Sequence, residues 1–239
     1  MLFAAGTRPT ADDVERLLTA SPAELSPAAQ VGHRPSNDAG WMELLASGLT
    51  YDLRGLAPGG AARLTPAVHV YGLPADIEKF GFEAVLLQPG EHIAAGASLL
   101  PIVRNLLGLA ATLALELPLT AVCWNPAQAW MDPRYFGRIV VNWLSGGVFP
   151  TLGLTGLRHG LGGALESSGL TYFIGQEICM PAREGQSGPE TMKLAGRLVD
   201  HLVRRGPIKT PMTLPGSNGE VLLLEPSADG KHIVITGPA

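Results

Sequence analysis

Residues 119–145, with the sequence LTAVCWNPAQAWMDPRYFGRIVVNWLS, carry the pattern that decides the fold. The apolar run at residues 119–124 predicts a buried strand. Asp132 and Pro133 predict the start of a helix that extends to about Ser145, because aspartate caps helix ends and proline fits the first turn. Apolar and aromatic side chains recur at helical spacing after Pro133, so one face of this helix should be buried.

The segment SSGLTYFIGQEI at residues 167–178 is the next part of this pattern. Its apolar residues predict a strand over residues 170–178. Residues 150–157 predict another strand, and the glycines at positions 160, 162 and 163 predict a turn after it. The order of strand, helix and strand therefore organises the middle of the chain.

The longest apolar segment runs from Ala97 to about Glu116 and predicts a helix. One interpretation is a membrane-attached segment over residues 93–115. Arg104 and Asn105 would then lie near the middle of the span, at a cost of roughly 2.5–3.5 kcal/mol for the arginine alone. We therefore expect a central helix that is buried on most sides within the protein, with Pro101 in its first turn.

Farther out, the chain predicts short strands in pairs between helices, and a hairpin at residues 221–236. This order predicts an α+β fold rather than a strictly alternating parallel one. We expect a mostly antiparallel or mixed sheet with helices packed on one face and one buried central helix. The other face of the sheet is then available to a ligand or to another subunit.

At 239 residues, the chain is long enough for one large domain or two small ones. Residues 26–40 are rich in Pro, Gly, Ser, Asn and Asp without periodicity, which predicts a mobile connection. We expect a strand–helix segment at residues 1–25 before this connection. The main α+β domain should then occupy residues 41–239.

The composition favours burial and association. Hydrophobic residues make up 46% of the chain and charged residues 16%, where about a quarter is usual. So little charge favours a homo-oligomer or a face covered by a protein partner. The net charge of −4 argues against nucleic acid, because Arg204, Arg205 and Lys209 form the only basic cluster and suit a helix C-terminus.

The two cysteines, Cys123 and Cys179, are far apart in the sequence and have no CxxC spacing. The first residues lack the basic start and long apolar run of a signal peptide. We therefore expect free thiols and a cytoplasmic location. A disulfide between the two cysteines is the alternative, and it would require an oxidising compartment.

The sequence lacks the common cofactor, metal and nucleophile motifs: GxGxxG after a strand, GxxxxGK[ST], HExxH and GxSxG. We therefore expect no cofactor and no metal. His159 is a weak candidate for a general base, if Glu177 lies beside it. Cys123 at the end of a strand is an equally weak candidate nucleophile, and a buried structural thiol is the alternative.

Two predicted strand ends carry polar or amphipathic residues: Trp124 with Asn125, and Gln176 with Glu177. If the two strands are neighbours, the indole could form the wall of a ligand pocket while the polar groups supply hydrogen bonds. The structural alternative is that Asn125 starts a turn before Pro126 and that Glu177 pairs with a surface cation.

Three features in a fixed order resemble a bacterial family of uncharacterised α/β proteins that is catalogued only as a domain of unknown function. They are residues 121–126 with 131–136, residues 167–170 with 173–178, and a final helix and hairpin. The resemblance covers residues 84–235, and Ser167 stands where the family pattern has threonine. It implies an α/β architecture and no established activity, cofactor or catalytic residue.

The sequence therefore predicts a soluble bacterial domain that binds a partner protein or itself and is not an enzyme. The alternative is a small-molecule hydrolase or transferase with its site near Trp124, Asn125, His159 and Glu177.

Overall fold

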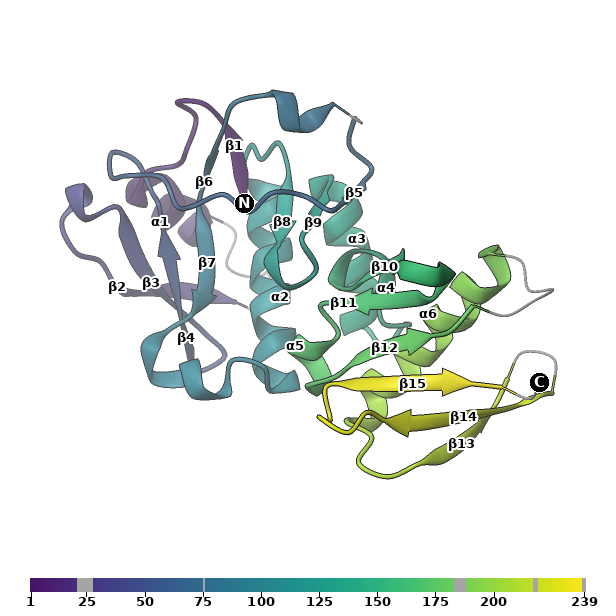
Figure 1. Ribbon diagram of the computed structural model, residues 1–239. Helices are drawn as coiled ribbons and strands as arrows, with labels where there is room; N and C mark the ends of the chain where they lie inside the picture. The colour runs from purple at the N-terminus through teal and green to yellow at the C-terminus, as the bar shows by residue number, and fades with distance from the viewer. Residues whose placement is uncertain (21–27, 75, 183–187, 217–218, 238–239) are drawn as a thin grey trace. The chain divides into compact units, whose positions relative to one another are not determined.

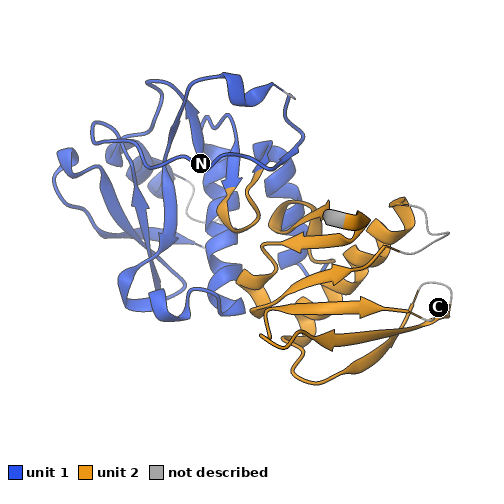
Figure 2. Cartoon of the chain, viewed as in Figure 1, with its two compact units in different colours: residues 1–123, 130–147 blue, residues 124–129, 148–239 orange. Residues whose placement is uncertain are grey.

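A computed structural model describes residues 1–20, 28–74, 76–182, 188–216 and 219–237 of the chain (Figure 1). Helices and mostly antiparallel strands combine in an α+β fold, as the sequence predicts. Two compact units are present, Met1–Cys123 with Trp130–Gly147 and Trp124–Ala129 with Val148–Ala239 (Figure 2). This division differs from the expected one, in which residues 41–239 form the main domain.

The described part of unit 1 combines three longer helices with several short strands. The helices are α1 (Ala11–Ala20), α2 (Leu100–Glu116) and α3 (Pro133–Leu144). A four-stranded antiparallel sheet has the order β2 (Ala29–His33), β3 (Trp41–Ala46), β4 (Leu49–Arg54) and β7 (Leu86–Pro89). Strand β1 (Leu2–Ala4) pairs with β6 (Phe82–Ala84), and β9 (Ala129–Met131) lies between β5 (His69–Tyr71) and β8 (Val122–Trp124).

Strand β2 corrects the expected connection at residues 26–40. Residues 29–33 pair with β3 in antiparallel register, so that Val31 lies opposite Leu44. The register shifts between Val31 and His33. Such a shift interrupts the alternation of side chains, which explains why the sequence shows no strand periodicity here. Residues 21–27, at the start of the expected connection, lie outside the described part of the chain.

Helix α2 is the predicted central helix. Val103, Leu107, Leu109 and Leu113 are almost completely buried, and Pro101 lies in the first turn. Among the described residues, no helix is both long enough and apolar enough to cross a membrane. The position of α2 in the core explains its lack of a polar face.

Helix α3 begins as predicted, because the Asp132 carboxylate accepts hydrogen bonds from the backbone amides of Arg134 and Tyr135, both at 2.9 Å. The Arg104 guanidinium of α2 donates to the Leu144 carbonyl at 2.9 Å and lies 4.8 Å from the centre of the Trp143 ring. The C-terminal end of α3 therefore supplies a carbonyl and an aromatic ring as partners for Arg104, which lies in the mostly apolar helix α2.

Unit 2 contains a six-stranded sheet in the order β10 (Gly156–His159), β11 (Leu165–Ser168), β12 (Glu177–Met180), β15 (His232–Thr236), β14 (Val221–Pro226) and β13 (Met212–Pro215). Among the described strands of this sheet, only β12 and β15 are parallel neighbours. The predicted hairpin at residues 221–236 is β14 and β15. Figure 1 shows α6 (Gly188–Arg205) along one face of this sheet.

Two predicted strands of this region are wrong in part. Residues 151–154 form a short irregular turn, α4 (Thr151–Leu154), with non-helical backbone angles at Leu152 and Gly153, and β10 begins only at Gly156. Residues 171–174 form another turn, α5 (Thr171–Ile174), between Gly169 and Gly175, which both have positive φ. A short apolar run does not distinguish a strand from a buried helical turn.

Candidate functional site

The two predicted strand ends belong to different sheets. Trp124 ends β8 of the three-stranded sheet, whereas Glu177 begins β12 of the six-stranded sheet. The segments nevertheless meet within unit 2, because the Trp124 ring lies 5.2 Å from Tyr172 and 6.1 Å from Phe173, centre to centre. At Gly169, a Cβ atom would lie 2.9 Å from the backbone of Ala127, so only glycine permits this approach.

Trp124 and Asn125 have structural roles in this arrangement. The indole of Trp124 is 9% exposed, and its Nε1 donates to the Leu154 carbonyl at 2.9 Å. Asn125 starts a short 3-10 turn with Pro126, and its carbonyl accepts from the Gln128 amide. Trp124 is therefore part of the core rather than the wall of an open pocket.

Gln176 is 4% exposed, and its side-chain amide joins three segments. Its Nε2 donates to the carbonyls of Ile208 and Gly230 at 2.9 and 3.0 Å, and its Oε1 accepts from the Ile208 amide at 2.7 Å. Both amide hydrogens are used in these bonds. The residue therefore holds the loop after α6 and the β14–β15 turn rather than a ligand.

Glu177 stabilises the helical turn α5, which lies within the region where the sequence predicts a strand. Its carboxylate accepts from the Ser167 hydroxyl, from the Leu170 amide at 3.2 Å and from the Thr171 amide at 2.9 Å. The amides at a helix start have no partner within the helix, so the carboxylate caps α5. The structural alternative paired Glu177 with a surface cation, but its partners are a hydroxyl and two amides.

The structure does not bring His159 and Glu177 together. His159 lies opposite Leu165, which lies opposite Met180, three residues along β12 from Glu177. Strand spacing and rise place the two residues roughly 14 Å apart. His159 is exposed, with Nδ1 3.4 Å from the Gly163 carbonyl.

The two cysteines are thiols rather than a disulfide. Burial raises the pKa of the Cys123 thiol, which therefore stays protonated and weakly nucleophilic at neutral pH. Burial and the nearby Glu166 raise the pKa of Cys179 in the same direction. Within the described ranges, no group of three or more His, Cys, Asp or Glu residues is placed to hold a metal ion.

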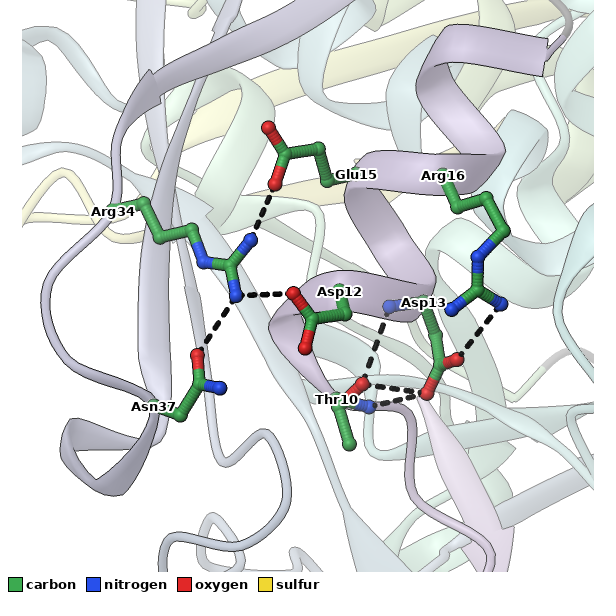
Figure 3. Close-up of polar contacts among 7 residues, drawn as sticks. All are labelled: Thr10, Asp12, Asp13, Glu15, Arg16, Arg34 and Asn37. Atoms are coloured by element: carbon green, nitrogen blue, oxygen red, sulfur yellow. Dashed lines mark hydrogen bonds and ion pairs between the residues drawn. The ribbon is translucent and has the colours of Figure 1, made fainter.

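A charged cluster beside α1 was not found from the sequence (Figure 3). Arg34 donates to the carboxylates of Asp12 and Glu15 and to the side-chain oxygen of Asn37. The guanidinium thus joins α1 to the segment after β2. Because the guanidinium is bonded to both carboxylates and to Asn37, this cluster holds the helix in place.

The remaining candidate is the face of the six-stranded sheet that α6 does not cover. Cys179 and Val234 are direct cross-strand neighbours on this face. Leu223 lies opposite Thr236 on the adjacent strand pair, and Val221 on the same strand is 59% exposed. We call Cys179, Val221, Leu223 and Val234 the sheet patch.

Carboxylates flank the sheet patch. Glu166 lies opposite Cys179, and Glu225 lies opposite Val234 on β14, the strand that also carries Val221 and Leu223. Arg158 is 3.8 Å from Glu166 and supplies a cation at that margin. An apolar centre with a charged margin is the arrangement found at protein–protein interfaces.

No protein-family model matches the chain, and no curated protein or solved structure matches it either. Four residues of the motif that suggested a family have structural roles in this fold. Ser167 and Glu177 are hydrogen-bonded to each other, Gly169 allows a close backbone approach, and Gln176 joins three segments. The site that remains for function is the sheet patch.

Proposed function

We propose that this protein is a non-enzymatic, self-associating domain in which the sheet patch of one copy packs against the sheet patch of a second copy. The observation that carries the proposal is that Cys179, Val234 and Leu223 are apolar and partly exposed on the sheet face that α6 does not cover, where Val234 lies opposite Glu225 and Leu223 opposite Thr236. A sheet face that is meant for water carries polar side chains in these positions. Apolar groups there gain free energy when a partner removes them from water.

A second copy suits this surface for a physical reason. In a two-fold interface the same patch meets itself, so apolar residues at the centre are self-complementary. Like charges directly opposite would repel, and here Glu166 and Glu225 lie one strand away from the row of Cys179 and Val234. At the margin of an interface such carboxylates stay hydrated.

The rest of the proposal concerns location and origin. Cys123 and Cys179 are thiols rather than a disulfide, which supports a reducing, cytoplasmic compartment. The resemblance to an uncharacterised bacterial α/β family supports a bacterial origin.

Light scattering coupled to size-exclusion chromatography tests the association. We expect a mass of twice the 25.0 kDa chain for the wild-type protein. Val234→Glu and Val221→Glu should each give a monomer, because a carboxylate cannot be buried without a partner. The matched control is Val141→Glu on α3, where the wild-type valine is 51% exposed and lies outside the patch. This control should remain a dimer.

Thiol crosslinking locates the interface. In a Cys123→Ser background, a short bismaleimide should join two copies through Cys179, and the further change Cys179→Ser should abolish the covalent dimer. A wild-type protein that stays monomeric at its highest soluble concentration would overturn the proposal. So would a dimer that survives both Val221→Glu and Val234→Glu.

A further inference from the structure

A pocket of about 250 Å³ lies between α6 and the edge strand β13, on the opposite side of the sheet from the sheet patch. Its lining residues are Leu194, Arg197, Leu198, His201, Leu214, Pro215 and Gly216. Leu194 and Leu198 are buried members of α6. Leu214 lies opposite the buried Leu222, so its side chain faces the helix. The floor of the pocket is therefore apolar.

The cationic side of the pocket comes from α6. Arg197 and His201 are four residues apart, so they lie on one face of the helix, and both are exposed at the rim. A guanidinium presents a planar fork of N–H donors that matches a carboxylate with two parallel hydrogen bonds. The imidazole adds a second donor one turn along the helix.

The edge strand itself is a poor place for an added strand. The Gly216 amide donates to the Glu220 carbonyl at 2.7 Å, and the alternation of an antiparallel pair then directs the backbone groups of Thr213 and Pro215 outward. Pro215 has no backbone N–H to donate. Pro211, just before the strand, is an even number of residues away, so the missing N–H lies at the same outer edge. An extended peptide would find only the Thr213 amide as a donor along this stretch, so recognition through side chains is favoured.

We propose that this pocket binds a small organic monocarboxylate, with the carboxylate on Arg197 and His201 and a short apolar body against Leu194, Leu198 and Leu214. The volume lies below the roughly 300–1,000 Å³ of pockets for drug-sized ligands, which favours a short chain or a single ring. The Glu220 side chain lies nearest to Gly216.

Titration of the labelled protein with hexanoate, followed by amide NMR shifts, tests this site. The shifts should be confined to residues 194–201 and 214–216. Hexan-1-ol, which keeps the chain and lacks the charge, should bind at least tenfold more weakly. Arg197→Gln should weaken hexanoate at least tenfold, and Arg205→Gln, in the last turn of α6 and outside the pocket lining, should leave it unchanged.

Leu214→Glu is a second variant, and it adds a carboxylate to the pocket wall, because Leu214 shares the helix-facing side of the sheet with its cross-strand partner Leu222. It should abolish the hexanoate shifts while the rest of the amide spectrum is retained, which shows that the fold is intact. Equal binding of hexanoate and hexan-1-ol would overturn the proposal. Shifts spread over the whole chain, or an Arg197→Gln variant that binds as wild type does, would overturn it too.

Discussion

The outward faces of the two larger sheets differ in what they present to water. In unit 1, the Arg54 guanidinium lies 5.2 Å from the centre of the Trp41 ring on the opposite strand and donates to the Asp52 carboxylate at 2.7 Å. In unit 2, the outward face carries the apolar side chains of Val234 and Leu223, which lie opposite Glu225 and Thr236. In unit 1 a guanidinium lies over an aromatic ring of the outward face, whereas in unit 2 Val234 and Leu223 stay partly exposed beside charged neighbours.

The inward faces of the same sheets are alike. Met42 and Leu44 in unit 1 and Ile233 and Ile235 in unit 2 are completely buried. Burial of one face therefore does not determine the chemistry of the other. A sheet needs only one apolar face to fold, so an apolar second face indicates a use beyond folding, and association is the use that removes it from water.

The largest expected effect separates the two faces of β14 in unit 2. Leu224 is completely buried. Leu224→Ala should lower the free energy of unfolding by about 2–5 kcal/mol, because it leaves a cavity in the core. Leu223→Ala, on the outward face, should cost the monomer less than about 1 kcal/mol and should weaken self-association. Urea titration and light scattering measure the two quantities. Equal losses of stability would mean that both faces are packed within one chain.

A slightly smaller effect is expected at Gln176, which holds unit 2 together with neutral hydrogen bonds. Gln176→Ala should lower the free energy of unfolding by about 2–3 kcal/mol, because buried backbone groups of Ile208 and Gly230 lose their partner. The control is Gln30→Ala at an exposed position of β2. A surface change of this kind should alter the free energy of unfolding by roughly 0.5 kcal/mol or less. Similar unfolding curves for the two variants would refute the structural role.

Arg54→Leu tests the charged cover of unit 1, in which Arg54 pairs with the buried Asp52. It should lower the free energy of unfolding by about 1–3 kcal/mol, because the Asp52 carboxylate loses its cation. Asp52→Asn in the same chain should recover part of the loss. The exposed leucine should also promote self-association through the outward face of the sheet. Light scattering would detect this association as a larger mass. If Arg54→Leu neither lowers the free energy of unfolding nor causes self-association, the outward faces of the two sheets are equivalent.

The smallest expected effect is at the start of α1 in unit 1. The Thr10 hydroxyl accepts from the Asp13 amide at 3.2 Å and donates to the Asp13 carboxylate at 2.7 Å. Thr10→Ala removes this helix cap and should lower the free energy of unfolding by about 0.5–2 kcal/mol. Hydrogen bonds from the backbone and hydroxyl of Thr10 also lower the pKa of Asp13.

That shift gives the effect a pH dependence. Because the folded pKa of Asp13 is depressed, its stabilisation is complete above the unfolded value of about 3.9 and is lost as the pH falls through the folded value. Thr10→Ala should therefore cost more at pH 6 than at pH 2 in urea titrations. A cost that is independent of pH would exclude the hydroxyl–carboxylate bond.

Local chemistry explains what could be predicted. Asp132 and Pro133 start α3 as expected, and Pro101 lies in the first turn of α2, because capping depends on residues within a few positions. The turn α5, between Gly169 and Gly175, is an element that local chemistry does not predict. The turn at Thr171 depends on the Glu177 carboxylate six residues later, and a search for strand periodicity does not find that contact.

The candidate site shows the same limit. Trp124, Asn125, Gln176 and Glu177 are important positions, as their place at the ends of apolar runs suggests. Their partners, however, are Leu154, Ile208, Ser167 and the Gly230 carbonyl, which only the folded chain brings near. A polar residue at a strand end looks the same in sequence whether it holds a ligand or a backbone carbonyl.

By itself, the sequence determined the α+β class, a buried helix within residues 97–116 and the helix start at Asp132. These follow from periodicity and from hydrogen bonds between near neighbours in the chain. Only the tertiary structure decided which strands share a sheet and which sheet face stays uncovered. Pairing such as that of Cys179 with Val234 joins residues far apart in the chain, and no local pattern specifies that register.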